Sequence, residues 1–307
     1  MKRITAGKND AGQRLDKFLV KFLNSMPKSL LYKAFRKKRI KVNGKKADGA
    51  YILMENDVLE LYINDEFFEK NQKADFADET EINVVYEDEN ILIADKPKGV
   101  LMHGEASDKK TLLSNLLAYL YKKGEFDPEK EQSFSPAFAN RIDKNTRGLV
   151  IAAKNSASLR ALNEKIRNGE IKKFYLCLLS KLPERESGVI ETYLKKNEAE
   201  NKVYVCDKDE KGAKYAKTIY RILKKEKNGV LCEVELVTGR THQIRAHMAH
   251  IGCPISGDVK YGALKDGAKE YQMLTSYKLL FDFDGRDEGV LSYLSGKSFT
   301  ISQNSFL

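Results

Sequence analysis

Three short segments of the chain carry side chains whose types and spacing are suited to chemistry at one site. In residues 140–149 a carboxylate, Asp143, lies in a basic, turn-forming sequence directly before an apolar run that predicts a buried strand. In the second segment Tyr175 follows two lysines and a phenylalanine on a predicted strand, so alternation decides which face it occupies. The third segment, residues 238–258, contains three of the four histidines and two arginines. Carboxylates, phenols and imidazoles serve in nucleophilic and acid–base catalysis.

Each segment also has an ordinary structural explanation when it is taken alone. A turn aspartate commonly bonds nearby backbone amides, and an aromatic residue in a strand usually packs against its neighbours. His242, His247 and His250 could be considered as metal ligands, because the last two can share one helix face. However, Arg240 and Arg245 lie among them, and no local carboxylate or cysteine pair completes a ligand set. We therefore expect no metal site, and structural hydrogen bonds for the histidines.

The elements that would position these residues are mostly strands. Apolar runs and turn residues predict strands over residues 82–86, 91–94, 149–153 and 174–179, and a long hairpin over 215–223 and 230–237. Helices are predicted after Thr111 and Ser156, each of which could cap its helix, and residues 125–136 are expected to be a loop. Many strands and few helices indicate an α+β fold with a mixed, mostly antiparallel sheet. No glycine-rich phosphate-binding motif occurs, so no nucleotide cofactor is expected.

The N-terminal part of the chain differs from the rest in charge. The 307 residues have a net charge of +10, but residues 1–50 contain 15 Lys and Arg and three Asp and therefore carry +12. Residues 51–100 contain 4 basic and 14 acidic residues and carry −10. A basic block of this density favours a polyanionic partner. Apolar spacing predicts helices that begin near Leu15 and Pro27, followed by a strand, the turn Asn43-Gly44 and a closing strand over residues 58–63.

The overall composition excludes several classes of protein. Hydrophobic residues make up 42% of the chain, with 15 Tyr and 14 Phe, which is enough to form a core and argues against disorder. The apolar runs are far shorter than the about 20 residues that a membrane-spanning helix needs. The four cysteines form no C-x-x-C pair, so we expect reduced thiols and a cytoplasmic location. We interpret residues 1–64 as one domain, the acidic residues 65–80 as a linker, and residues 81–307 as a second domain.

Residues 12–63 resemble the S-four-type RNA-binding domain, a small α/β module. The resemblance rests on Arg14-Leu15-Asp16 at the first helix, Lys28-Ser29 at the second, and residues 40–44 in the strand and turn. In that family the helix pair and the following turn bind structured RNA. The resemblance makes five residues candidates for contacts with RNA phosphates: Lys33, Arg36, Lys37, Arg39 and Lys41. Such contacts supply affinity and position but little sequence information.

The three chemical segments together resemble the RluA-type pseudouridine synthases, with an overall likeness to the RluC group of large-subunit ribosomal RNA enzymes. The pattern R-I-D-x-x-T-x-G-L occupies residues 141–149, and a K-x-Y element occupies 173–175. The pattern G-R-T-H-Q-I-R-x-H occupies 239–247 and is followed by G-x-P-I-x-G-D at 252–258. The family usually has His where this chain has Asn140, so any role of that imidazole in RNA contact is open here.

This resemblance implies an isomerase that breaks the N-glycosidic bond of a uridine in RNA and rejoins the base through carbon. Asp143 would be the nucleophile, adding either to the sugar or to the uracil ring. Arg245 would pair with Asp143 and keep it ionised, and Tyr175 would face the uracil and take a proton from the ring. The target base must leave its helix to react. Arg141 would fill the space that the base leaves, and Arg240 would also contact RNA. No metal or cofactor is required.

Two other classes of protein remain as alternatives at this point. The first is a non-catalytic RNA-binding or ribosome-assembly protein, which the presence of Asp143 argues against. The second is a metal-dependent hydrolase of nucleic acid that uses the three clustered histidines. Large-subunit ribosomal RNA is the expected substrate, with transfer RNA next, and we expect no membrane partner and a monomeric protein.

Overall fold

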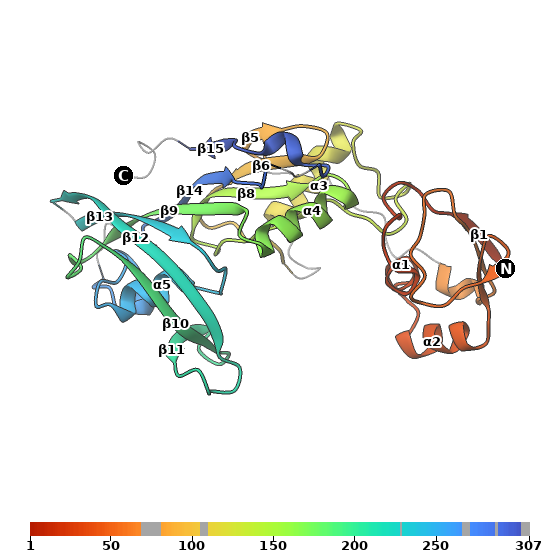
Figure 1. Cartoon of the computed structure of the whole chain (residues 1–307), viewed down its shortest axis with the longest axis horizontal. Helices are drawn as coiled ribbons and strands as arrows, with labels where there is room; N and C mark the ends of the chain where they lie inside the picture. The colour runs from red at the N-terminus through yellow and green to blue at the C-terminus, as the bar shows by residue number, and fades with distance from the viewer. Residues whose placement is uncertain (69–80, 105–109, 228, 266–270, 286–287, 302–307) are drawn as a thin grey trace.

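The computed structural model describes the chain except for residues 69–80, 105–109, 228, 266–270, 286–287 and 302–307. The described residues form two β-sheets in two units (Figure 1), and the core of the first is separate from those of the second. None of the helices in these parts of the chain is long and apolar enough to cross a membrane.

The N-terminal unit is a four-stranded antiparallel sheet with two helices. Its elements are β1 (Lys2–Thr5), α1 (Leu15–Phe22), α2 (Lys28–Arg36), β2 (Ile40–Val42), β3 (Lys45–Lys46) and β4 (Val58–Leu61), in the sheet order β1-β4-β2-β3. The predicted periodicity of α1 is confirmed, because Leu15, Phe18 and Leu19 are fully buried. The predicted turn is also confirmed: Asn43 and Gly44 both have positive φ, 52° and 73°, as a two-residue hairpin requires.

The second unit is built on an 11-stranded sheet in the order β11-β10-β12-β13-β9-β14-β8-β6-β5, with β15 beside β14 and β7 beside β8. All neighbours are antiparallel except β14 and β8, which confirms the α+β fold with a mixed, mostly antiparallel sheet. The 3₁₀ turn η1 (Asp65–Phe68) follows the N-terminal unit and packs on its core. The elements of the second unit are β5 (Val84–Glu87), β6 (Ile91–Lys96), α3 (Leu112–Lys122), β7 (Ala137–Phe138), β8 (Arg147–Ala153), α4 (Ser156–Arg167), β9 (Ile171–Leu179), β10 (Ser187–Asn197), β11 (Lys202–Cys206), β12 (Lys214–Glu226), β13 (Gly229–Leu236), α5 (Gln243–His250), η2 (Val259–Tyr261), β14 (Leu274–Phe281), η3 (Ser292–Leu294) and β15 (Ser298–Thr300).

Two hydrophobic cores cover opposite faces of this sheet. Leu92 and Ala94 of β6 face a core that includes α3 and α5, whereas Ile91 and Ile93 face a core that includes α4. Because β6 and β8 are buried on both faces, their sequences are continuous apolar runs. Tyr175 of β9 belongs to the first core, which confirms that alternation places it on the face that α5 covers.

Several local predictions are confirmed and others are wrong. Thr111 caps α3 as expected, because its Oγ accepts a hydrogen bond from the backbone N of Ser114 at 3.1 Å. The cap of α4 is Asn155 rather than Ser156, since the Asn155 side chain accepts from the backbone N of Ser158 at 2.9 Å. The predicted loop over residues 125–136 has no helix or strand. The expected linker begins with the 3₁₀ turn η1, whose Phe67 packs on the N-terminal core, and its residues 69–80 lie outside the described residues.

Polar contacts join the N-terminal unit to the loop before β7 and to α4. The Asn9 amide donates to a Glu131 carboxylate oxygen at 2.8 Å, and the Ser133 hydroxyl donates to the Asp10 carboxylate at 2.6 Å. The Asn9 carbonyl oxygen also accepts from the backbone N of Ser156 at 3.2 Å, at the start of α4. The hydrophobic cores of the two units share no residue. The contacts between the units are therefore mainly polar, and these hydrogen bonds fix their relative orientation.

A substitution at Gly148 tests the close approach of β8 and β14, which supports the segment containing Asp143. Gly148 has φ of 122°, and a methyl group at its Cα would lie 2.1 Å from the backbone oxygen of Ser276. Because that oxygen belongs to the sheet and cannot move away cheaply, we expect Gly148→Ala to lower the free energy of unfolding by about 3 kcal/mol or more in urea denaturation.

The matched control is Gly124→Ala. Gly124 has φ of 72° but nothing within 4 Å of an added methyl group, so only backbone strain of about 1 kcal/mol is expected. Equal losses of stability in the two variants would show that the close approach to β14 is not the cause.

Candidate active site

A buried lysine, Lys96, fixes the backbone of the segment that carries Asp143. Lys96, at the end of β6, is completely buried and its Nζ donates three hydrogen bonds of 2.8–2.9 Å to backbone carbonyl oxygens, those of Pro97, Val100 and Lys144. Burial lowers the pKa of Lys96 to about 8, while the carboxylates of Asp143 and Asp95 act in the opposite direction. The ammonium group therefore joins the loop after β6 to the residue that follows Asp143. Sequence reasoning assigned no role to Lys96, although a lysine at the end of an apolar strand was a visible signal.

Asp143 and Arg245 form an ion pair, as the resemblance implied. Arg245 Nη1 lies 3.1 Å from Asp143 Oδ2, and the Arg245 side chain is 9% exposed whereas that of Asp143 is 28% exposed. The same guanidinium binds Asp258 with two parallel hydrogen bonds, from Nε at 2.7 Å and from Nη2 at 2.8 Å. Burial acts to lower the pKa of Arg245, but Asp258 and Asp143 together raise it above its ordinary value. Arg245 therefore stays charged and holds one oxygen of Asp143, while the carboxylate remains accessible.

Tyr261 fixes the other side of the Arg245 guanidinium. The guanidinium carbon lies 4.9 Å from the centre of the Tyr261 ring, a cation–π distance. The Tyr261 hydroxyl accepts a hydrogen bond from the backbone N of Val203 at 2.9 Å and shares another with His242 Nδ1 at 3.0 Å. Burial raises the pKa of Tyr261 to about 12, so the phenol keeps its proton at neutral pH. Asp258 and Tyr261 were not among the predicted site residues, although Asp258 closes the motif at 252–258.

The three clustered histidines do not converge on one point. His242 has the left-handed φ of 52° at the start of α5, and its Nε2 lies 3.8 Å from Asp143 Oδ2. His247 is fully buried, and its two ring nitrogens share hydrogen bonds with Thr192 at 2.9 Å and Thr218 at 2.8 Å. His250 is exposed at the end of α5. In the described parts of the chain no group of three His, Cys, Asp or Glu side chains could hold a metal ion.

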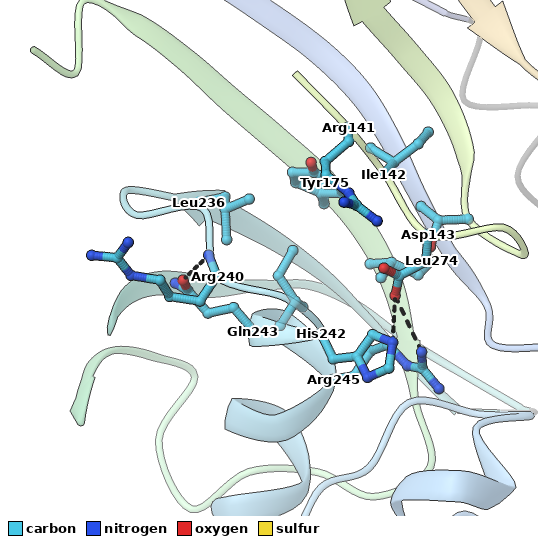
Figure 2. A pocket seen from close by; sticks show the side chains of 12 residues that line it. Arg141, Ile142, Asp143, Tyr175, Leu236, Arg240, His242, Gln243, Arg245 and Leu274 are labelled. Carbon is cyan, nitrogen blue, oxygen red and sulfur yellow. Dashed lines mark hydrogen bonds and ion pairs between the residues drawn. The ribbon is translucent and has the colours of Figure 1, made fainter. Parts of the chain in front are cut away.

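Asp143, Tyr175 and Arg245 lie around one open pocket of about 370 Å³ (Figure 2). Its apolar wall is formed by four side chains: Ile142, Leu236, Ile244 and Leu274. Tyr175 is 3% exposed, and burial raises its pKa above the ordinary value, so its hydroxyl is protonated at neutral pH. The pocket is therefore lined by apolar and charged side chains together, which suits a ligand that has an apolar face and polar edges.

The two predicted RNA-binding arginines of the catalytic unit lie at the edge of this pocket. Arg141 is exposed and lies above Tyr175 in Figure 2. Arg240 is also exposed, and its Nε donates to the backbone oxygen of Tyr215 at 2.9 Å. Figure 2 shows that the Arg240 guanidinium points away from Asp143, so it is placed to meet a neighbouring part of a ligand rather than the reacting group.

Asn140 has a structural contact at the position where the family has His. Its Oδ1 accepts a hydrogen bond from the backbone N of Ile151 at 2.8 Å. Its Nδ2 is buried and has no hydrogen-bond partner among the residues that the structure describes. Asn140 is therefore directed into the sheet and not into the pocket, whose lining it does not join.

The remaining five predicted RNA contacts form a second cluster on the N-terminal unit. The cluster comprises Lys33, Arg36, Lys37, Arg39 and Lys41, on α2, the turn after it and β2. The first four are exposed and Lys41 is half-buried. None of them makes an ion pair with another described residue, so their charges are available to a ligand. The structure thus separates the candidate residues into a pocket and a distinct basic surface.

Comparisons with known proteins show which proteins this chain resembles in sequence and fold. Residues 90–250 match the family model described as RNA pseudouridylate synthase. Ribosomal large subunit pseudouridine synthase C of Haemophilus ducreyi is 32% identical, over 84% of this chain and 78% of the relative. An uncharacterized RNA pseudouridine synthase of Mycoplasma capricolum is 33% identical, over 92% of each chain. The solved structure of human RNA pseudouridylate synthase domain containing 4 superposes with a TM-score of 0.54 at 19% identity, over 72% of this chain and 88% of that chain.

The burial of His247 predicts a pH dependence of stability. Burial lowers the pKa of His247 to about 4, from an ordinary value near 6.5. Between about pH 6.5 and pH 4 His247 is protonated in the unfolded chain but not in the folded chain. The free energy of unfolding therefore falls as the pH falls through this window. His247→Gln, which keeps a hydrogen-bonding side chain without a titrating group, should remove up to about 3 kcal/mol of that decline in urea denaturation.

The control for this prediction is His250→Gln, at the exposed end of the same helix. It should keep most of the decline of the unmodified protein, because the charge of His250 lowers the pKa of His247 less than burial does. An unchanged decline in His247→Gln would mean that the buried imidazole is not the source.

Proposed function

The chain belongs to the RNA pseudouridylate synthase family, and we propose that Asp143 is the nucleophile with which it isomerises a uridine of large-subunit ribosomal RNA. The observation that carries the assignment of Asp143 is its 3.1 Å contact with Arg245 inside a pocket that leaves the carboxylate accessible. The guanidinium binds one carboxylate oxygen, Oδ2, and the other oxygen is left to attack the substrate. The names of the relatives from Haemophilus ducreyi and Vibrio cholerae support large-subunit RNA as the substrate.

In the proposed reaction the target uridine leaves its helix and enters the pocket, at a cost of a few kcal/mol. Asp143 forms a bond to the sugar or to the ring, and the bond between N1 and the sugar carbon C1′ breaks. C1′ is then joined to C5 of the uracil, and the bond to Asp143 breaks again, which returns the free carboxylate. The proton on C5 is lost and N1 gains one, so atoms balance without a redox partner. No step calls for a metal or cofactor.

We assign two further roles in this pocket. Tyr175 lies in the pocket wall, where its ring can face the uracil. Because burial keeps its hydroxyl protonated, Tyr175 takes the proton that leaves C5 only as it passes its own proton on to solvent or to the substrate. Arg141, exposed at the mouth, is placed to enter the space that the extruded base leaves in the RNA. Arg240, which points away from Asp143, would hold RNA that flanks the target nucleotide.

We also propose that residues 1–64 are an RNA-binding domain of the S-four type, that 65–80 link it to the catalytic domain, and that 81–307 are the catalytic domain. The separate core of the N-terminal unit and its five cations without ion pairs support this division. We also propose that the enzyme is monomeric. Because an enzyme of ribosomal RNA works where ribosomes are assembled, we propose a cytoplasmic location.

Replacement of the nucleophile tests the proposed function directly. Asp143→Asn should lower the release of tritium from a large-subunit ribosomal RNA transcript, labelled at uracil C5, by at least about 10³-fold. The amide keeps the shape of the side chain but cannot form the bond to the substrate, so RNA affinity should change little. Asp209→Asn, a change at an exposed carboxylate, is the control and should keep full activity. Full tritium release by Asp143→Asn would overturn the assignment.

A further inference from the structure

The N-terminal unit contains a second pocket, far in sequence from Asp143. It lies between α2 and the segment that follows β4, and it encloses about 580 Å³ including its open mouth. Its floor is apolar and includes Leu30, Ala34, Ile63 and Phe67. Leu30 remains 40% exposed there, which leaves apolar surface in contact with water. A pocket of this size accommodates a small planar ligand.

Three cations surround this apolar floor. Lys33, Lys37 and Arg39 all line the pocket, and none of them makes an ion pair with another described residue. Glu60, which accepts a hydrogen bond from a pocket residue, is already paired with Arg3 at 2.8 Å. The rim therefore presents uncompensated positive charge, and an anion that binds there displaces only water and counterions.

An aromatic ring completes the pocket wall. Tyr62 lines the pocket and is 39% exposed. The Nζ of Lys41 lies 5.2 Å from the centre of its ring, so the ring is held beside a cation. Asn64 adds an amide at the same wall. Its Nδ2 donates to Glu66 Oε1 at 3.4 Å, and its carbonyl oxygen can accept from the edge of a base. An aromatic ring, an amide and cations are the groups that bind a nucleobase and its phosphates.

We infer that this pocket binds one unstacked nucleotide of the RNA substrate, with its base against Tyr62 and the flanking phosphates on Lys33, Lys37 and Arg39. The inference rests on the proposed function, because it takes RNA as the ligand. A paired RNA helix presents phosphates and sugars on its outside and hides the faces of its bases. Phosphate contacts alone would need the cations but not an apolar floor or an exposed ring. Only a base that has left the stack offers both kinds of surface to one pocket.

The unmodified full-length protein and four variants of it test this inference with two RNA probes. The probes are a short RNA duplex with one bulged 2-aminopurine and a bulge-free duplex of otherwise identical sequence. Because the chain has no tryptophan, the emission of 2-aminopurine can be followed in the complex. The unmodified protein should bind the bulged duplex more tightly than the plain one and quench its emission.

Removal of the Tyr62 ring should act on the bulged probe alone. Stacking of one base on an aromatic ring is worth about 1–3 kcal/mol, so Tyr62→Ala should weaken binding of the bulged duplex by about 5- to 150-fold and abolish the quenching. Binding of the plain duplex should not change. Tyr62→Phe should behave like the unmodified protein, because the ring is kept. Tyr32→Ala, at a 50% exposed tyrosine of α2 that does not line the pocket, should leave both affinities unchanged.

The fourth variant separates failure of the inference from failure of the proposed function. Neutralising Lys33, Lys37 and Arg39 together, each to Gln, should flatten the salt dependence of binding by about 0.7 to 0.9 for each phosphate that the protein no longer neutralises. If this slope flattens but Tyr62→Ala weakens both probes equally or neither, the unit binds the RNA backbone only and the nucleotide pocket is overturned. If the slope is also unchanged, the proposed RNA-binding role of the N-terminal unit fails together with the inference.

Discussion

One guanidinium, that of Arg245, is the interaction on which the rest of the active site depends. It binds Asp258 with two parallel hydrogen bonds and Asp143 with a third contact, so a single positive charge holds two carboxylates in a small volume. Asp258 is completely engaged and buried, whereas Asp143 keeps one oxygen for the pocket. The two carboxylates are bound differently because the planar guanidinium donates its N–H groups in fixed directions, two of them to Asp258 and one to Asp143.

Two neighbouring side chains, Tyr261 and Lys96, limit the movement of this ion pair. Tyr261 covers a face of the Arg245 guanidinium and is itself tied to β11 and to His242. The buried ammonium of Lys96 fixes the backbone next to Asp143. Burying these charges is expensive unless every partner is in place. The site therefore needs a rigid surrounding structure that keeps these partners in contact. The close approach of β8 to β14 at Gly148 contributes to that rigidity.

The sequence predicts the parts of this site that are encoded locally. Asp143 and Arg245 follow from their motifs, and alternation along β9 places Tyr175 on the correct face because strand geometry leaves only two choices. The helices α1 and α3 follow from apolar spacing and, for α3, from the Thr111 cap. The contacts of Lys96 and Tyr261 could not be predicted, because each joins segments that are distant in the chain and no local pattern reports them. β10, β11 and β14 were also missed. β10 in particular buries only Ile190 and Leu194, which are four positions apart, so its sequence lacks the two-residue period that predicts a strand.

The proposed nucleophile, Asp143, is held by the same guanidinium that binds Asp258, and Arg245→Lys tests the need for this forked contact most directly. A lysine keeps the charge but has one compact ammonium group, which cannot bind Asp258 in two places and reach Asp143 at the same time. We predict that this variant binds large-subunit RNA with nearly unchanged affinity and unfolds cooperatively, while pseudouridine forms in a single turnover at least about 10²-fold more slowly. A single-turnover rate equal to that of the unmodified enzyme would contradict the account, because charge alone would then suffice.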